Sequence, residues 1–422
     1  MIPPASPKTL SSCRRRTTCR LCDGKDLSVV LSLTPTPPAN AFLPVEAISG
    51  AEESYPLDLF FCANCRHLQL LDVVDPRVLF ENYVYVSGTS PVFVRHFESY
   101  AEDVIRRFHL KPRDLVVEIG SNDGTLLRFF KQAGMRVLGV DPAKKIAEKA
   151  SASGVETWPE FFNQTVASRI LKIHGPAATV CANNVFAHID DLQGIVQNVR
   201  EILSPRGVFV FEASYLLDVY EKTLFDTIYH EHLDYHRVGP LQSFLAAQGL
   251  EFIEALRVDA HGGSLRGIAQ KRGGPHRQGS SVKELAVKEA DAGLDCAGTF
   301  RDFARRIDQR KQELALLLKE IKGQGKKIAG FGAPAKATTL MHHFGLGKDV
   351  IDFIVDSSPM KQGLFTPGLH VPILPPKSIQ EYKPDYILIL AWNFASSIIE
   401  SLQPYRNAGG RFIIPLPEVR IV

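Results

Sequence analysis

Twelve consecutive residues between Phe225 and His236 bring together side chains that can move protons. The segment holds three histidines, two tyrosines and three acids. Imidazole gains or loses its charge close to neutral pH, so a histidine held beside a reacting atom can accept a proton. His188 is expected to approach the same site as this segment. The pattern predicts an acid–base site, and two alternatives stay open: a metal bound by His232 and His236, four residues apart, or ordinary surface histidines.

Four of the seven cysteines form two pairs with the spacing Cys-x-x-Cys: Cys19, Cys22, Cys62 and Cys65. Two such pairs can complete the tetrahedral thiolate shell of Zn2+, although iron accepts the same ligands. Because four thiolates leave no open position for water, the ion is predicted to be structural and to supply folding free energy. Redox-active or simply reduced pairs are the alternatives. The other three cysteines look unpaired, which predicts a reducing, cytoplasmic compartment.

A buried strand, a turn of small residues and a helix are expected from residue 114 to residue 130, followed by a strand that ends at Asp141. Glycines in such a turn let the backbone approach a ligand, and an acid ending the second strand can accept hydrogen bonds from both ribose hydroxyls. A dinucleotide-binding turn would read G-x-G-x-x-G, and the turn here is too acidic for a pyrophosphate. It carries five candidate cofactor residues: Glu118, Gly120, Asn122, Asp123 and Gly124.

This turn resembles motif I of the class I S-adenosylmethionine-dependent methyltransferases. The resemblance implies that Glu118 and Gly120 frame the methionine portion of the cofactor and that Asp141 binds its ribose. It also implies that Asn183 and Asn184, which end a later strand, contact the amino-acid end of the cofactor. Further strands are expected at residues 178–181, 207–211, 250–258 and 264–270, to complete a seven-stranded sheet.

A second glycine turn lies in the last third of the chain. Helical segments are expected over residues 282–323, and a strand, a glycine turn and a helix over residues 327–340. Later strands at 350–356, 386–393 and 411–415 complete a smaller Rossmann-like unit. Pro334 interrupts the spacing of a dinucleotide fingerprint, so NAD is not expected. The turn at the start of a helix, together with Lys336, could still bind a pyrophosphate.

Three features of the chain together resemble the nucleotide-sugar C-methyltransferases: the two cysteine pairs, Tyr-His-Glu-His at 229–232 and Gly-Phe-Gly-Ala-Pro-Ala-Lys-Ala at 330–337. The resemblance runs over nearly the whole chain. Members of this family, such as the TDP-4-keto-6-deoxyhexose C-3 methyltransferases, methylate a carbon beside the sugar ketone. The resemblance implies that His232 is the base, although spacing alone cannot choose between it and His230. It also places four side chains around the sugar: Tyr83, His188, Tyr229 and Glu231.

The expected chemistry requires more than a base. A C–H bond beside a ketone is too weak an acid for imidazole unless the developing enolate oxygen is stabilised. Tyrosine hydroxyls and a second histidine can supply that stabilisation, with the sulfonium in line behind the methyl group. The resemblance places the nucleotide sugar against the C-terminal unit, and each of its candidate contacts could instead form a structural turn: Ser264, Arg266, Ala333, Lys336 and Asn393.

We therefore predict an α/β protein in which a class I methyltransferase sheet is flanked by an N-terminal zinc ribbon and a smaller C-terminal Rossmann-like domain, with domains at 1–80, 81–272 and 280–422. The net charge of +3 on 422 residues does not suggest a nucleic-acid partner, and no apolar run approaches the roughly 18 residues of a membrane span. We expect a monomer that uses S-adenosylmethionine, structural zinc and a nucleotide-sugar substrate. The alternatives are a methyltransferase acting on oxygen or nitrogen and a non-catalytic zinc-ribbon binding protein.

Overall fold

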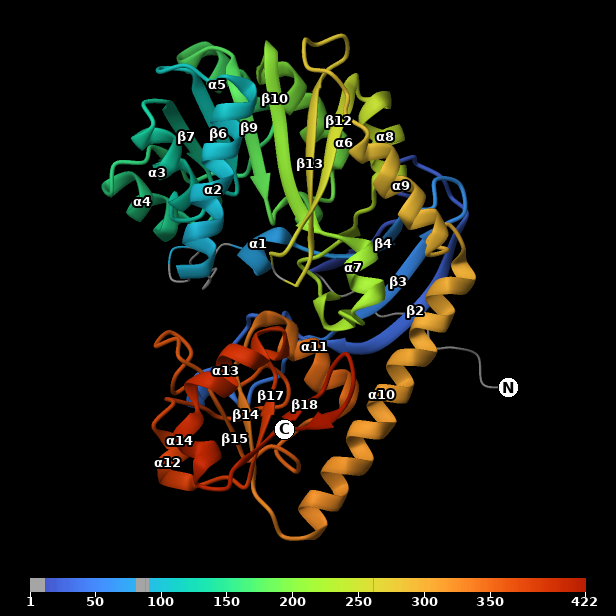
Figure 1. Ribbon diagram of the computed structural model, residues 1–422, viewed down its shortest axis with the longest axis vertical. Coiled ribbons are helices and arrows are strands. Elements are labelled where there is room, and N and C mark those ends of the chain that lie inside the picture. Colours follow the sequence, from blue (N-terminus) through green and yellow to red (C-terminus); the bar gives the residue numbers. More distant parts are fainter. Residues whose placement is uncertain (1–11, 81–87, 89–90, 261) are drawn as a thin grey trace.

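The computed structural model describes residues 12–80, 88, 91–260 and 262–422. A central sheet fills the upper part of Figure 1 and a C-terminal sheet fills the lower part. The N-terminal strands run along one side between them, and the long helix α10 (Ala297–Gly323) passes from the upper part to the lower. Three groups of strands therefore meet around the middle of the molecule.

The central sheet has seven strands in the order β12-β13-β10-β9-β6-β7-β8. Their bounds are Leu250–Val258, Ser264–Lys271, Leu203–Ser214, Ala177–Asn183, Leu115–Ile119, Arg136–Val140 and Thr157–Trp158. The sequence predicted six of these strands, but β8 has only two residues and too few for a periodic pattern. In the described part of the chain, eight helices accompany the sheet: α2 (Pro91–Phe108), α3 (Thr125–Gln132), α4 (Lys144–Ala152), α5 (Gln164–His174), α6 (Leu192–Ile202), α7 (Leu216–Glu221), α8 (Val238–Ala247) and α9 (Ser281–Asp291), which packs against β12.

Strand β6 lies at the point where the order of the central strands reverses. It pairs in parallel with β7 on one side and with β9 on the other. All five residues of β6 are buried, as expected for a parallel strand that is covered on both faces. In open α/β sheets, ligands bind beside the carboxyl ends of the strands at such a reversal. The turn after Ile119 and the end of β9 at Asn183 therefore meet at one edge.

The N-terminal sheet has four strands in the order β11-β4-β3-β2, and β1 pairs separately with β5. Their bounds are Asp234–Tyr235, Leu68–Leu70, Tyr55–Cys62, Leu27–Thr36, Cys13–Arg15 and Asp72–Val74. The short helices η1 (Val45–Ala47) and α1 (Pro76–Phe80) belong to the same region. Strand β11 follows the histidine cluster in sequence and pairs with β4. The N-terminal sheet thus takes one strand from beyond residue 80, which sequence patterns did not indicate.

The C-terminal sheet has six strands in the order β16-β15-β14-β17-β18-β19, parallel except for the last. Their bounds are Ile373–Leu374, Phe353–Val355, Ile328–Phe331, Tyr386–Ile389, Arg411–Ile414 and Arg420–Ile421. The accompanying helices, with α10, are α11 (Ala335–Phe344), α12 (Ser378–Tyr382), α13 (Ala395–Ser401) and α14 (Gln403–Asn407). This sheet and the seven-stranded sheet confirm the predicted fold class.

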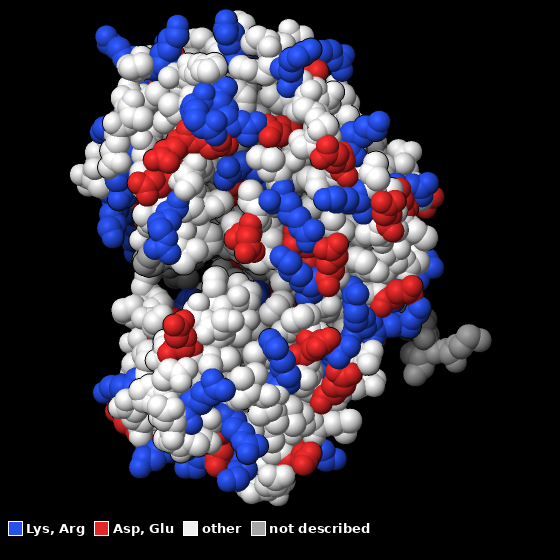
Figure 2. Space-filling model, viewed as in Figure 1, with Lys and Arg blue, Asp and Glu red and all other residues white. Residues whose placement is uncertain are grey.

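The surface in Figure 2 carries charges of both signs, interspersed over the face that is shown. A hollow opens between the upper and lower parts of this face. In the described part of the chain, no helix combines the length and the apolar composition that crossing a bilayer requires.

Candidate active site and metal centre

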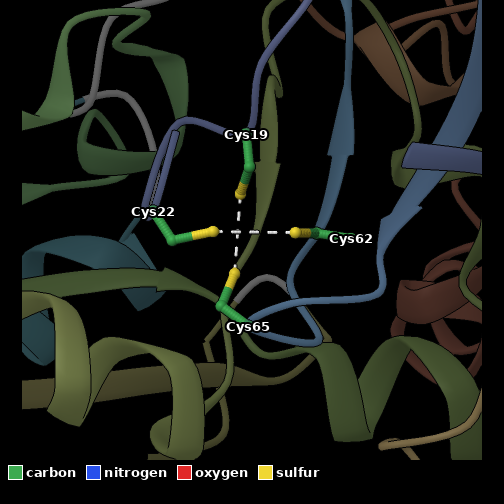
Figure 3. A group of neighbouring side chains, drawn as sticks. All are labelled: Cys19, Cys22, Cys62 and Cys65. Atoms are coloured by element: carbon green, nitrogen blue, oxygen red, sulfur yellow. Dashed lines mark hydrogen bonds between the residues drawn. The ribbon is translucent and has the colours of Figure 1, made fainter. Parts of the chain in front are cut away.

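The four paired cysteines converge at one point of the N-terminal region (Figure 3). Their sulfur atoms all lie within 4.8 Å of one another. The Sγ atoms of Cys19 and Cys65 are 3.5 Å apart, and those of Cys22 and Cys62 are 3.7 Å apart. A Zn–S distance of about 2.3 Å in a tetrahedron gives sulfur–sulfur separations of about 3.8 Å. The spacing and the all-thiolate donor set therefore fit a four-coordinate zinc ion.

The two cysteine pairs have the same local backbone. The amide of Asp23 donates to the carbonyl of Cys19 at 3.0 Å, and the amide of Arg66 donates to the carbonyl of Cys62 at 2.8 Å. Asp23 and Arg66 follow the second cysteine of each pair, and both have positive φ, 55° and 66°. These tight turns fold both thiols of each pair toward the same centre.

A cavity of about 670 Å3 lies at the reversal point of the central sheet and extends to the C-terminal sheet. Eleven of the predicted site residues line it, namely Glu118, Gly120, Asn122, Asp141, Asn183, Asn184, His188, Tyr229, His232, Lys336 and Asn393. They come from both sheets and from the histidine cluster. Such a volume is within the usual range for a small-molecule site.

The turn after β6 brings its backbone close to the cavity. Gly120 has φ of 68°, and a Cβ there would lie 2.9 Å from the side chain of Val185. The amides of Asn122 and Ala143 donate to the two carboxylate oxygens of Asp141, at 2.8 and 2.9 Å. Glycine is therefore required at position 120, and Asp141 is held at the end of β7 in one orientation.

Several buried polar atoms of the cavity wall have no partner within the described protein: Glu118 Oε2, Ser121 Oγ, Asn183 Oδ1 and Asn183 Nδ2. Buried polar groups are normally hydrogen-bonded, so unpartnered ones in a cavity wall indicate a polar ligand. Burial raises the pKa of Glu118 well above its ordinary value, and the nearby charges of Asp141 and Asp123 add to the shift, so the ionised carboxylate needs stabilisation. A cationic ligand would supply that stabilisation. These groups fit the ammonium and amino-acid carboxylate of S-adenosylmethionine, with Asp141 beside its ribose.

His232 has one ring nitrogen engaged by the backbone. Its Nδ1 lies 2.7 Å from the carbonyl oxygen of Thr227. Because a carbonyl only accepts hydrogen bonds, Nδ1 carries the proton and Nε2 keeps a lone pair. Burial lowers the pKa of His232 to about 4, so the ring is neutral at pH 7. The ring packs on Tyr229 at 4.1 Å and stacks on His188 at 5.1 Å between centroids. This arrangement suits a general base.

His230 and Glu231, also predicted at the active site, do not line the cavity. The Nε2 of His230 lies 3.3 and 3.2 Å from the carbonyl oxygens of Tyr55 and Pro56, and the residue is 1% exposed. Glu231 accepts a hydrogen bond from Asn40 Nδ2 at 2.7 Å. Both residues thus contact the N-terminal region. The predicted Tyr83 lies outside the described residues.

The C-terminal region holds the other end of the histidine segment. Asp226, which is fully buried, accepts a hydrogen bond from Trp392 Nε1 at 2.7 Å and lies 3.5 Å from Lys336 Nζ. Thr339 Oγ1 donates to the carbonyl of Ile228 at 2.8 Å. The segment that carries His232 is therefore anchored by side chains far away in sequence.

Lysine side chains line the C-terminal wall of the cavity. Lys336 is the second residue of helix α11 and lies over the ring of Trp392, 4.3 Å from its centroid. Lys361 Nζ donates to the carbonyl of Ala333 at 2.7 Å. Burial lowers the pKa of both lysines, and Asp226 opposes that shift for Lys336. The opposite wall presents carboxylates, so the cavity has an acidic side and a basic side.

Five other predicted residues do not line the cavity, and their roles toward cofactor or substrate stay predictions. Ser264 donates to the carbonyl of Ala260, and Arg266 pairs with Glu212 at 2.6 Å because the two residues lie directly opposite each other in the antiparallel pair of β13 and β10. Asp123 accepts from the hydroxyl of Thr125, the first residue of α3, at 2.6 Å. The other two act through their backbone: Gly124, with φ of 74°, and Ala333, whose amide donates to Asp356 at 2.7 Å.

Sequence reasoning missed several residues that line the cavity, notably Asn40, Asp190, Asp191 and Lys361. Lys361 follows strand β15, at the ligand-binding edge of the second Rossmann-like unit, and its position after that strand could have indicated it. Asp190 could have been indicated in the same way, because it comes shortly after the end of β9. Asn40 had no such signal, because it reaches the site by long-range packing of a proline-rich segment.

Three family models match the chain in succession. They are described as "Putative zinc binding domain" over residues 19–80, "Methyltransferase domain" over 93–255 and "C-methyltransferase C-terminal domain" over 259–417. C-methyltransferase NovU from Streptomyces niveus is 37% identical over 404 residues, which cover 96% of this chain and 96% of NovU.

Solved structures resemble part of the chain. Magnesium protoporphyrin IX methyltransferase (ChlM) from Synechocystis PCC 6803, with bound SAH, is 17% identical and covers 42% of this chain and 83% of its own, with a TM-score of 0.33. The YcgJ protein from Bacillus is 14% identical and covers 44% of this chain and 100% of its own, also with a TM-score of 0.33. The match with NovU extends over nearly all of both proteins, and on that ground the chain belongs to the C-methyltransferase family.

Proposed function

We propose that the protein transfers a methyl group from S-adenosylmethionine to a carbon beside the ketone of a nucleotide-linked 4-keto-6-deoxy sugar. The observation that carries this proposal is the polarity of the cavity. Carboxylates line its wall at the central sheet, lysines line its wall at the C-terminal sheet, and the segment of His232 connects the two walls. A cationic methyl donor and an anionic nucleotide diphosphate suit these opposite charges.

The central wall would hold the cofactor, which supplies an electrophilic methyl group when bound. Glu118 and Asn183 face the cavity with unpartnered polar atoms that can bind the amino-acid end. Asp141 keeps acceptor lone pairs for ribose hydroxyls, since each of its oxygens receives one backbone hydrogen bond. Gly120 allows the cofactor to approach the backbone of the turn.

The C-terminal wall would hold the nucleotide diphosphate. Lys336 and Lys361 place two ammonium groups at the cavity, and the N-terminal end of α11 adds backbone amides. Asn393 offers an amide for the sugar or the base. Lys336 already lies beside Asp226, so the diphosphate and the Asp226 carboxylate would both interact with the Lys336 ammonium group.

The bound sugar would present the C–H bond beside its ketone to His232. Nε2 of His232 would accept the proton, which leaves an enolate carbon able to take the methyl group that the cofactor supplies, with S-adenosylhomocysteine as the leaving group. Because the carbonyl of Thr227 accepts a hydrogen bond from Nδ1–H, the tautomer and orientation of the ring are fixed, and Nε2 is the nitrogen that faces the substrate. Tyr229 and His188, which pack against His232, can donate to the keto oxygen as it gains negative charge. We place the reaction at C3 of the sugar.

The four cysteines would hold a structural zinc ion. Their thiolates fill a tetrahedral shell, so no position remains for substrate or water. The ion would fix the turn before β2 to the turn between β3 and β4.

Mass spectrometry of the enzyme with S-adenosylmethionine and a panel of TDP-, GDP-, UDP- and CDP-linked 4-keto-6-deoxyhexoses tests the proposal. One sugar is expected to gain a single methyl group, and NMR of the product is expected to locate it at C3. A methyl group at C5 would correct the position only. Transfer to oxygen or nitrogen, or no transfer to any sugar of the panel, would overturn the proposal.

A further inference from the structure

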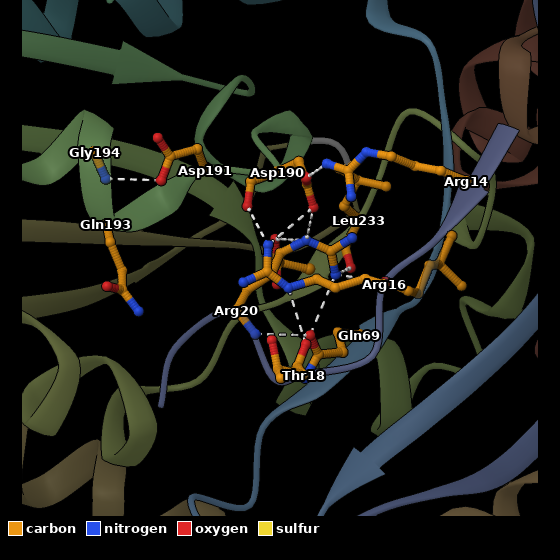
Figure 4. Close-up of polar contacts among 12 residues, drawn as sticks. Arg14, Arg16, Thr18, Arg20, Gln69, Asp190, Asp191, Gln193, Gly194 and Leu233 are labelled. Atoms are coloured by element: carbon orange, nitrogen blue, oxygen red, sulfur yellow. Dashed lines mark hydrogen bonds and ion pairs between the residues drawn. The ribbon is translucent and has the colours of Figure 1, made fainter. Parts of the chain in front are cut away.

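Arg20 is a fully buried arginine inside the first cysteine pair, between Cys19 and Cys22. Its Nε lies 2.9 Å from Oδ1 of Asp190, in the loop after β9 that lines the cavity. Its NH1 group donates to Gln69 Oε1 at 3.2 Å and to the carbonyl of Leu70. Figure 4 shows the guanidinium group enclosed by these partners. Arg20 therefore joins a cysteine turn to the wall of the candidate active site.

The partners of Arg20 lie where the segment that carries His188 meets the segment that carries His232. The amide of Leu233, next to His232, donates to the carbonyl of Ala187, next to His188, at 2.8 Å. The carbonyl of Leu233 accepts from the amide of Leu70 at 2.8 Å and lies 3.5 Å from NH1 of Arg20. One guanidinium group thus contacts both segments, one through Asp190 and the other through Leu233.

Three arginines pair with Asp190, and the exposure of each side chain indicates how strongly it holds the Asp190 carboxylate. The side chains of Arg14, Arg16 and Arg20 are 63%, 19% and 0% exposed. Solvent screens the pair made by Arg14, whereas the pair made by Arg20 is removed from water. A buried charge must keep its partners, because leaving it unpaired is strongly destabilising. The position of Asp190 is therefore governed mainly by Arg20.

We propose that Arg20 is a positioning residue that fixes the His188 segment against the His232 segment. The cysteine turn would thereby set the geometry of the two stacked histidine rings without touching the substrate. This role rests on the proposed function, in which those rings carry out proton transfer. A shift of about 1 Å in such a site can lower a rate by about 100-fold. Lysine cannot replace the planar fork that reaches Asp190 and Leu70 together.

Three variants test the role of Arg20: Arg20→Gln, Arg20→Lys and Asp190→Asn. Arg237→Gln is the matched control, because Arg237 is also buried and its guanidinium contacts the carbonyl of Arg66, beside the second cysteine pair. Arg237 pairs with Asp295 at 2.8 Å, and neither residue lines the large cavity. Each variant is compared by kcat, KM for the sugar, calorimetric Kd for S-adenosylmethionine, zinc content and Tm.

The Arg20 and Asp190 variants are expected to lose about 10- to 100-fold in kcat, with KM and the cofactor Kd changed less than about threefold. The Arg20→Gln/Asp190→Asn double variant should lose no more than the worse single variant, since both remove one contact. Arg237→Gln is expected to lower Tm while its kcat stays within about twofold. If Arg20→Gln lowers Tm but keeps normal kcat, Arg20 is only structural and the inference is wrong. If Arg20→Gln does not fold, unchanged kcat in Asp190→Asn overturns it instead.

A spectroscopic measurement separates this inference from the proposed function. NMR of histidine ring protons reports the stacking of His188 on His232 through ring-current shifts, whether or not a sugar is methylated. These shifts are expected to change in Arg20→Gln and to stay in Arg237→Gln. Unchanged shifts in Arg20→Gln would contradict the inference. Absence of methyl transfer by the wild-type enzyme would contradict only the proposed function.

Discussion

At the scale of single residues, hydrogen bonding separates the two candidate bases better than their spacing does. His230 and His232 are both buried enough for their pKa values to fall to about 4. His230 faces two backbone carbonyls of the N-terminal region, whereas His232 faces the cavity. The sequence placed both histidines in one cluster, but it could not show which partners come from residues far away in the chain.

Replacing His232 with asparagine tests the proposed base. Asparagine can still donate to the carbonyl of Thr227 but cannot accept a proton from carbon. Methyl transfer is expected to fall by about 1000-fold or more, in line with the loss of a general base. The cofactor Kd, measured by calorimetry, is expected to stay within about threefold. A variant with near-normal turnover would show that another group removes the proton.

The pKa of His232 predicts the acid side of the pH–rate profile. Burial lowers this pKa from 6.5 to about 4, and the Thr227 carbonyl only partly opposes the shift. The neutral form is the base, so activity is gained as pH rises through the lowered pKa. We expect kcat/KM to change little from pH 8 down to about pH 5.5 and to fall below that. A fall centred at pH 6.5 or above would mean that His232 titrates like an exposed histidine.

At the scale of elements, the turn between β6 and α3 was predictable in outline and not in detail. Its strand, glycine and helix follow from apolar periodicity and from the position of Asp141. The pattern grouped Asp123 and Gly124 with the cofactor, but both serve the start of α3. Similarly, β13 was predicted correctly, although the direction of Arg266 depends on the sheet that surrounds it.

Substituting alanine for Gly120 tests this turn. The new Cβ would meet the side chain of Val185 at 2.9 Å. The alanine would also have to adopt the glycine's φ of 68°, which residues with a Cβ rarely do. Cofactor affinity is expected to drop by about 10-fold or more, because the turn must move to relieve the contact. Calorimetric titration with S-adenosylmethionine measures this effect.

Gly134→Ala is the control for backbone strain. Gly134 has φ of 91°, but its Cβ would meet no atom closer than 3.7 Å. It lies outside the cavity lining, so its variant should lose some stability and keep the cofactor affinity. Equal loss of affinity in both variants would show that strain alone, not the turn, explains the result.

At the scale of the whole molecule, the three regions interlock around the histidine segment. Strand β11 extends the N-terminal sheet, Asp226 contacts the C-terminal region, and Leu233 bonds to Ala187, in the short 3-10 helix that ends at His188. The order of the regions along the chain was predictable because each has its own pattern. Their contacts were not, since a pattern read along the sequence contains no information about which surfaces meet.

Substituting serine for Cys62 tests the structural zinc site. The wild-type protein is expected to hold about one zinc ion per chain, bound by the four thiolates. Plasma emission spectroscopy measures the zinc content. Cys62→Ser should lose zinc and lower Tm by several degrees or more, because the metal contributes folding free energy. Cys296→Ser is the control, since Cys296 is exposed and is not in the cysteine cluster. Normal Tm and zinc content in Cys62→Ser would contradict a zinc site.

The most direct test of the central claim is solvent deuterium exchange. The accepted nucleotide sugar is incubated in D2O with the enzyme and S-adenosylhomocysteine, and NMR follows the proton beside the ketone. The account predicts that wild-type enzyme replaces this proton with deuterium and that His232→Asn does so at least about 100-fold more slowly. Exchange at the wild-type rate in His232→Asn would contradict the assignment of His232 as the base. Methyl transfer without any exchange or isotope effect at that carbon would contradict the enolate mechanism.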